Sequence, residues 1–245
     1  MKRNGLGAGF ALVLLLVAAA SLLGAAVRLS GESALYGSLS RSAVEELYRR
    51  EGREKVTRED ITGAIGLDED SQEEVARELA AFMREESETL PRVLGDKEVQ
   101  HMWDVRRLMS SLDRLSRGML LVSGIGVLLL ALCRNSWREA TRALLAGAVL
   151  AGLVVAVSVL AGGILGFTRL FELVHRVAFD NQLWMMDPET QILIRMMPST
   201  LFEHALHLTV VRALSGMLIT LALLTGVYVL VHGMTLRNLQ AGGKE

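Results

Sequence analysis

Residues 5–27 read GLGAGFALVLLLVAAASLLGAAV, a run of apolar and small residues with no charged side chain. A helix rises about 1.5 Å per residue, so this run is long enough to cross a hydrocarbon layer of about 30 Å. Lys2 and Arg3 precede it, and it is longer than the roughly 7–15 apolar residues of a secretory signal peptide. We therefore expect a retained membrane anchor, with a cleaved signal as the alternative.

Three further apolar blocks occupy residues 118–133, 143–167 and 213–231. The first of these is short. It reaches spanning length only if the residues before it are included and Arg117 extends its guanidinium toward the lipid headgroups. We therefore predict an all-α membrane protein with four transmembrane helices and a helical cap outside the membrane.

The composition excludes several other classes of protein. The chain has 245 residues, of which 51% are hydrophobic and 22% are charged, so it is not a disordered chain. Its net charge of −1 gives no broad basic field for nucleic acid. The single cysteine, Cys133, excludes an internal disulfide and a cysteine-based zinc site. We expect no cofactor and no metal.

The distribution of Lys and Arg predicts the orientation of the four helices. Residues 1–4, the link 134–142 and the tail 232–245 are basic, and four spans place all three segments on one side. Basic residues are enriched in cytoplasmic segments, so both termini are expected in the cytoplasm. Residues 28–117 and 168–212 then face outward.

The larger outer segment, residues 28–117, has helical patterning. Thr57 is a candidate N-cap with Asp60 three residues later. An apolar stripe at helical spacing follows: Val75, Leu79, Phe82 and Met83. Residues 168–212 are less polar and rich in aromatic residues and Met, which favours an interfacial segment packed on the bundle.

Chemistry-bearing residues are few, and most have a simpler interpretation. The apolar runs of the four spans contain no ionisable residue, which argues against a transporter. There is no GxSxG motif, and Cys133 is expected on the cytoplasmic side. His204 and His207 have metal-compatible spacing, but a surface position is the favoured interpretation. Four arginines form a basic stripe that favours contact with lipid headgroups: Arg106, Arg107, Arg114 and Arg117.

Two histidines remain, and each has a carboxylate three residues away. His101 precedes Asp104, and His175 follows Glu172, so each carboxylate can fix the tautomer of its imidazole on one helical face. The residues alone leave two hypotheses open, a catalytic pair and two unrelated structural histidines.

Two strings around these histidines resemble a known family. HMWDVRRLM at 101–109 and FELVHRVAFDNQLWMMDPETQILIRMMPSTLFE at 171–203 resemble the lipoprotein intramolecular transacylases, which are small bacterial four-span membrane proteins. The upstream segments TREDI at 57–61 and FMREESETL at 82–90 are similar too. Two departures stand out: Val177 and Ala178 occupy an aromatic position, and Gln191 stands where an acid is usual.

The resemblance implies an enzyme of the bacterial plasma membrane that acts on lipoprotein N-termini. It would move an ester-linked acyl chain from the diacylglyceryl group to the α-amine of the N-terminal cysteine. The family's paired histidines map to His175 and His101, which we expect to act as base and as acid or orienting partner. Asn181 and Arg106 are candidates for contact with the carbonyl or oxyanion. The alternative is a non-catalytic membrane scaffold or lipoprotein-binding module.

This mechanism needs the two imidazoles to meet. His101 lies seventeen residues before residue 118, which is roughly 25 Å along a straight helix, and His175 lies about eight residues past the third span. We therefore expect the segment around 98–117 to bend along the membrane surface, or the membrane boundary to lie higher on it. Two imidazoles with a pKa near 6.5 are expected to hold opposite protonation states near neutral pH, so that one takes a proton from the amine and the other supplies one to the alkoxide.

Overall fold

The structure, a computed structural model, describes residues 3–132, 166–216, 218–219 and 222. Within these residues its regular elements are all helices, joined by loops, and none is a strand, which confirms the predicted all-α class. The expected third span 143–167 and fourth span 213–231 lie largely outside the described residues. The link 134–142, the tail 232–245, Cys133 and His232 lie wholly outside them.

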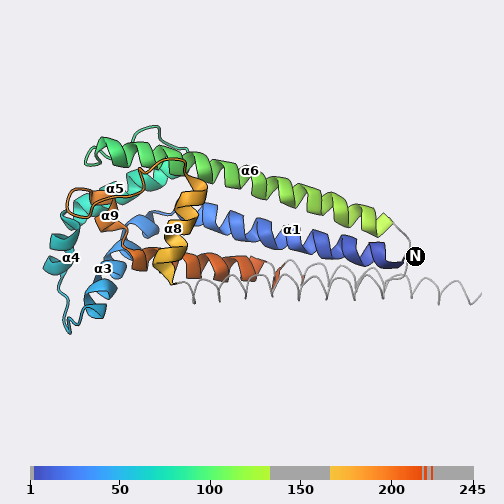
Figure 1. Cartoon of the computed structure of the whole chain (residues 1–245), viewed down its shortest axis with the longest axis horizontal. Helices are drawn as coiled ribbons and strands as arrows, with labels where there is room; N and C mark the ends of the chain where they lie inside the picture. The colour runs from blue at the N-terminus through green and yellow to red at the C-terminus, as the bar shows by residue number, and fades with distance from the viewer. Residues whose placement is uncertain (1–2, 133–165, 217, 220–221, 223–245) are drawn as a thin grey trace, which may run out of the picture.

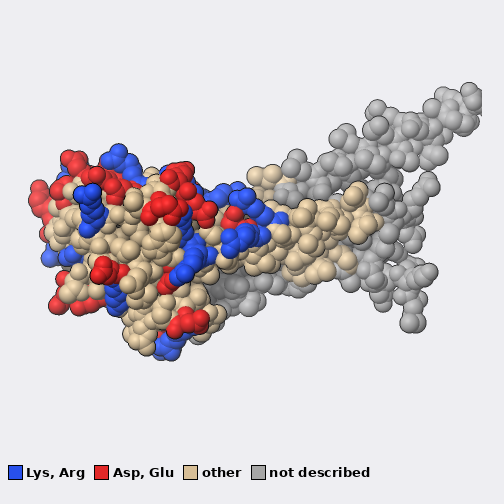
Figure 2. Space-filling view, turned by 90° about the horizontal axis from the view of Figure 1, so that it is seen from above, with Lys and Arg blue, Asp and Glu red and all other residues tan. Residues whose placement is uncertain are grey.

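Two long helices, α1 (Arg3–Ser30) and α6 (Asp96–Leu132), lie side by side and form a shaft (Figure 1). Among the described residues one stretch, Leu12–Ser30 in α1, is long and apolar enough to cross a membrane, with a mean hydropathy of 2.4. The C-terminal half of α6 exposes large apolar side chains, including Leu121 and Leu128. On the face seen in Figure 2 the end of the described shaft that lies away from the cap shows no charged side chain, whereas the cap carries both signs of charge.

Small residues allow α1 and α6 to approach closely. A Cβ atom added at Gly126 would lie 2.7 Å from Cγ2 of Val13, so a larger residue would force the Val13 side chain or one of the helices to shift. The hydroxyl of Ser116 donates a hydrogen bond of 2.8 Å across the interface to the carbonyl oxygen of Ala20. Backbones that meet through Gly and Ser are typical of helix pairs in lipid, where close packing and interhelical hydrogen bonds drive association.

The cap consists of α2 (Ser33–Tyr36), α3 (Ser38–Arg50), α4 (Arg58–Ile65), α5 (Glu69–Met83), α9 (Ile192–Met196) and the first turns of α6. Thr57 caps α4 as predicted: its hydroxyl accepts from the Asp60 N–H, and the Asp60 carboxylate accepts from the Thr57 N–H. This capping box satisfies two N–H groups that the helix leaves unpaired.

Both outer segments contribute to one core in the cap. The predicted stripe of α5 is buried, with Leu79 and Phe82 completely inaccessible. Leu193, Met196 and Leu201 from the second outer segment are buried against it, so this segment does more than line the membrane interface. The core therefore ties residues that follow the third predicted span to residues that precede the second.

Helix α8 (Phe167–Ala178) runs across the bundle toward α6 rather than along it (Figure 1). It exposes an apolar face that includes Leu173, Val174 and Val177. α6 is one continuous helix from Asp96 to Leu132, which contradicts a sharp bend at residues 98–117. The approach to His101 is made by α8 instead. The other expectation, a membrane boundary that lies higher on this segment, stays a prediction.

Glu98 anchors the start of α6 to the second outer segment. Its side chain is buried, and its carboxylate accepts the backbone N–H groups of Gly95 at 2.6 Å and Leu193 at 2.7 Å. A carboxylate that accepts two backbone bonds satisfies donors that would otherwise be buried without partners. This contact positions α9, and with it the chain that returns from α8.

Replacing Glu98 with Ala should lower the free energy of unfolding by about 1–3 kcal/mol, because the buried N–H of Leu193 and the partly buried N–H of Gly95 lose their acceptor. The measurement is thermal unfolding of the purified protein in detergent. Glu74→Ala, at an exposed position of α5, is the matched control and should leave the midpoint nearly unchanged. Equal midpoints for the two variants would contradict this role of Glu98.

Candidate active site

His101 lies in the second turn of α6 and is 7% exposed. Met102 beside it belongs to the cap core, so the turn that carries the imidazole is held firmly in place. His175 lies near the C-terminal end of α8 and is partly buried. The centroids of the two rings are 6.1 Å apart, with the ring planes inclined at 33°. The structure thus brings together the two histidines that the sequence singles out.

Aromatic side chains surround the two imidazoles. The ring of Phe179 lies 5.2 Å from His101 and 5.6 Å from His175, so it contacts both. Trp184 lies 5.2 Å from His175, and Phe171 lies 3.9 Å from it, one turn earlier on α8. These apolar rings lower the polarity of the surroundings of the pair.

Sequence reasoning missed Phe179 as a member of the site. It noted only that Val177 and Ala178 stand where an aromatic residue is usual. The signal was one residue further on: α8 ends at Ala178, and the extended backbone of Phe179 turns its ring back toward the pair.

A backbone bond fixes the tautomer of His175. Its Nδ1 lies 2.8 Å from the carbonyl oxygen of Phe171. A carbonyl oxygen only accepts, so Nδ1 carries the hydrogen and the neutral ring keeps its lone pair on Nε2. His175 is therefore oriented to accept a proton at Nε2.

His101 contains an unpaired polar atom. Its Nδ1 is buried and has no hydrogen-bond partner among the described residues. An unmade hydrogen bond at a buried polar atom costs about 1–3 kcal/mol, and such atoms are rare in native structures. An atom of this kind beside a second imidazole is a candidate for contact with a substrate.

Burial disfavours the charged form of both rings. It lowers the pKa of His101 from 6.5 to about 4, with a further contribution from the nearby His175, and the charge of Asp104 opposes the shift only in part. Burial also lowers the pKa of His175, although the bond to the Phe171 carbonyl opposes this. Both imidazoles are therefore neutral at neutral pH, so the two do not hold opposite protonation states in the resting site.

Asp104 and Asn181 link the two segments beside the pair. The Asn181 amide donates a hydrogen bond of 2.8 Å to one carboxylate oxygen of Asp104, and Arg107 binds the other. Burial alone would raise the pKa of Asp104, but the bonds from Asn181 and Arg107 lower it overall. The carboxylate is thus charged, and it holds the chain after α8 against α6.

The structure does not bring Glu172 and Arg106 to the pair. Glu172 forms an ion pair of 3.5 Å with Arg176 on the exposed side of α8. Arg106 is buried, and it donates to the Ser87 carbonyl and to Glu88, both at 2.9 Å. Its guanidinium therefore stabilises the loop between α5 and α6 and does not extend to the membrane surface as the basic stripe predicted.

Other candidates from the sequence lie apart from the pair. His204 and His207 are exposed on the helical stretch 199–216. Within the described ranges no group of three or more His, Cys, Asp or Glu side chains is arranged to hold a metal ion. Gln191 replaces a usual acid, yet its side-chain oxygen accepts the Asp187 N–H, a role that needs an oxygen acceptor but no charge.

Comparison with known proteins gives one family. The profile of the family described as lipoprotein intramolecular transacylase Lit matches residues 44–202. The membrane integral lipoprotein intramolecular transacylase Lit from Bacillus cereus has a similar structure, with a TM-score of 0.63, 19% identity, and coverage of 91% of this chain and 96% of that one. Curated protein sequences contain no match.

Two further structures of the Bacillus cereus protein, each with one histidine replaced, are also similar. The arginine variant and the alanine variant both give a TM-score of 0.61 at 20% identity. The matches cover 91% of this chain, and 92% and 94% of the two variants. At this level of identity the likeness establishes the fold, and the profile match establishes the family.

The protonation of His101 can be measured directly. In protein with isotopically labelled histidine, the NMR resonances of His101 should titrate near pH 4 rather than 6.5. A pKa below its unfolded value means that the unfolded chain binds more protons in this window, so this group's contribution to stability is lost as the pH falls from 6.5 toward 4. A midpoint at or above 6.5 would contradict the burial of this ring.

The charge of Asp104 raises the pKa of His101 against the effect of burial. Asp104→Asn should therefore lower the His101 midpoint further, because the carboxylate no longer stabilises the imidazolium. The same titration measures this, with Asp113→Asn, two to three turns further along α6, as the control. A rise of the midpoint in Asp104→Asn would show that the carboxylate does not act on this ring.

Proposed function

Because the chain belongs to the lipoprotein intramolecular transacylase family, we propose that it moves one ester-linked acyl chain of a bacterial lipoprotein. The chain would pass from the diacylglyceryl group to the α-amine of the N-terminal cysteine, which yields the lyso form. The observation that carries this proposal is the convergence of His101 and His175, at 6.1 Å, inside the region that matches the family.

The proposed setting is the outer face of a bacterial plasma membrane. Four spans at 5–27, 118–133, 143–167 and 213–231 would leave both termini in the cytoplasm. The long apolar helix α1 and the exposed apolar side chains in the C-terminal half of α6 support this arrangement. The outer segments 28–117 and 168–212 would then hold the histidine pair outside the hydrocarbon layer, where a lipoprotein N-terminus is accessible.

His175 is the proposed base. Its Nδ1 is committed to the Phe171 carbonyl, so Nε2 is free to accept the proton that the attacking amine must lose. The pKa of His175 lies below 6.5, which keeps this lone pair available at neutral pH. The aromatic rings around it restrict water, which would otherwise compete with the amine for the ester.

His101 is the proposed orienting partner. With a pKa of about 4 it is neutral, and a neutral imidazole assists as a hydrogen-bond donor rather than as a charged acid. The substrate would satisfy polar atoms of this ring, including the buried Nδ1 that has no partner among the described residues. Between acid and orienting partner, the low pKa favours the second role.

The atoms of the reaction balance without a cofactor. The amine nitrogen attacks the ester carbonyl carbon, a C–N bond forms, and the bond from that carbon to the glyceryl oxygen breaks. His175 takes one proton from the amine and returns one to the departing oxygen, so an amide and a free hydroxyl result. Both reacting groups belong to one molecule, and holding them in register supplies much of the rate.

Asp104 and Asn181 are proposed as positioning residues. Their hydrogen bond fixes the chain that carries Phe179 and Trp184 against α6, and these rings bound the space in which the ester and amine would meet. One of the two amide N–H groups of Asn181 donates to Asp104. A contact between this amide and an oxyanion would therefore use the second N–H group.

Mass spectrometry of lipoprotein N-termini tests the proposal. A bacterial host without this activity that expresses the wild-type chain should accumulate N-acylated, lyso-glyceryl peptides. His175→Ala and His101→Ala should each lower their yield by at least about hundredfold, since each removes a group that moves or orients a proton.

His204→Ala and His207→Ala are the matched controls, because both change exposed histidines of the same outer segment. Each should retain the wild-type yield. No lyso-form product from abundant, folded wild-type protein would rule out the proposed activity, and unchanged yield from His175→Ala would rule out the proposed base.

A further inference from the structure

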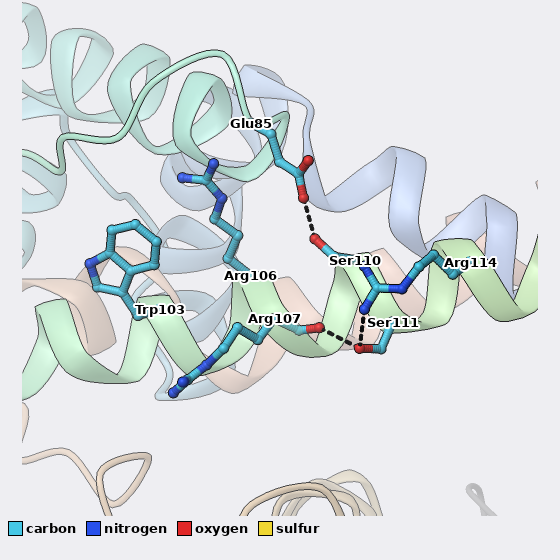
Figure 3. A pocket seen from close by; sticks show the side chains of 7 residues that line it. All are labelled: Glu85, Trp103, Arg106, Arg107, Ser110, Ser111 and Arg114. Atoms are coloured by element: carbon cyan, nitrogen blue, oxygen red, sulfur yellow. Dashed lines mark hydrogen bonds between the residues drawn. The ribbon is translucent and has the colours of Figure 1, made fainter.

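A concave site lies along α6, where the cap meets the shaft. A pocket of about 340 Å³ is lined by residues of α6 and by Glu85 from the loop after α5. We call it the junction pocket. Figure 3 shows its α6 side chains arranged on successive turns from Trp103 to Arg114. None of them is proposed to touch the ester or the amine in acyl transfer.

The floor of the junction pocket is rigid. Arg106 is buried, and its guanidinium lies 4.5 Å from the ring of Phe82 and 5.2 Å from that of Trp103. Its hydrogen bonds to Ser87 and Glu88 hold the loop that carries Glu85. Buried contacts therefore fix the floor of the pocket, whereas Arg107, Ser111 and Arg114 at its rim are exposed.

Arg114 supplies an available positive charge. Its guanidinium turns back over α6 and donates a hydrogen bond of 3.0 Å to the Ser111 hydroxyl (Figure 3). Among the described residues Arg114 has no carboxylate partner, whereas Arg106, Arg107 and Arg117 are paired with Glu88, Asp104 and Asp113. An arginine with free donors beside a hydroxyl favours an anion with several oxygens.

Glu85 supplies an acceptor at the opposite rim. It is the one residue other than glycine with a positive φ, 64°, in the part of the chain that the structure describes, and its carboxylate accepts from the Ser110 hydroxyl. This conformation ends α5, where the N–H groups of Glu85 and Glu86 donate to the carbonyl oxygens of Phe82 and Ala81. The pocket thus offers a cation and an anion at separate points, which matches a ligand that carries an anionic group and hydrogen-bond donors.

The position of the junction pocket beside the apolar part of α6 indicates which kind of ligand it would bind. Directly after Arg114, α6 exposes Leu115 and then Leu120 and Leu121, where the apolar shaft begins. Figure 2 shows Lys and Arg side chains gathered at this junction. If the shaft spans the membrane as proposed above, the pocket lies in the headgroup layer, which extends about 5–8 Å beyond the hydrocarbon on each side.

We propose that the junction pocket binds the phosphodiester of one outer-leaflet phospholipid. Arg114 and Ser111 would hold the phosphate, and Glu85 would accept from N–H or O–H donors of the head group. Ethanolamine and glycerol head groups have such donors, and choline has none. The inference rests on the proposed membrane placement but not on acyl transfer.

Native mass spectrometry of the full chain in nonionic detergent tests this binding. Dioleoyl phosphatidylethanolamine and dioleoyl phosphatidylglycerol should each add as one tightly bound molecule. Dioleoyl phosphatidylcholine should bind more weakly, and dioleoylglycerol, which lacks a phosphate, should bind at least about tenfold more weakly. Equal binding of all four lipids would overturn the proposal.

Arg114→Gln should weaken the two tightly bound phospholipids by about tenfold, because the phosphate loses a charged donor. Arg117→Gln is the matched control: it lies one turn further on α6, is exposed and paired with Asp113, and does not line the pocket. Equal losses in the two variants would indicate nonspecific attraction to the headgroups and would overturn the site.

Glu85→Ala should abolish the preference over phosphatidylcholine while leaving binding of the phosphate in place, and a preserved preference would overturn the role of Glu85. Inorganic phosphate lacks the acyl chains and should not displace a bound lipid. Complete displacement would assign the pocket to a soluble phosphate and overturn the lipid assignment. Wild-type protein that transfers acyl chains but binds no lipid here would contradict this inference alone.

Discussion

The proximity of His101 and His175 depends on the path of α8, which crosses the bundle to reach α6. Without this crossing, His101 and His175 would lie at different heights on different helices. Two contacts hold the crossing in place after α8 ends: the bond between Asn181 and Asp104, and the acceptance of the Leu193 N–H by Glu98. Both acceptors are on α6, so one helix orients the return of the chain as well as one of the imidazoles.

Burial of the two imidazoles determines their protonation. The rings of Phe171, Phe179 and Trp184 pack around the pair, and burial lowers the pKa of both histidines. Two neutral imidazoles suit a reaction in which the nucleophile is an amine of the substrate and no charged acid is needed at rest. The unpaired Nδ1 of His101 is consistent with a site completed by its substrate.

The sequence predicted the helical class, the cap on α4 and the buried stripe of α5, because these features follow from local capping and periodicity. The motifs around His101 and His175 also identified these two residues as candidates, although the sequence did not show that the rings lie close together. It did not predict that α8 crosses the bundle, nor that Phe179 contacts both rings, because these depend on tertiary contacts between distant segments. Arg106 was misread for the same reason: its partners Ser87 and Glu88 lie in a loop whose fold no local pattern reveals.

The central claim is that two imidazoles act as one unit in acyl transfer, and a double-variant cycle tests it most directly. Single-turnover rates would be measured with purified wild-type protein, His101→Ala, His175→Ala and the double variant on a diacylglyceryl lipopeptide. If the rings cooperate, the double variant will be no slower than the slower single variant, because the second substitution removes nothing further. Losses that multiply fully in the double variant would mean that the rings act independently, which would contradict the account.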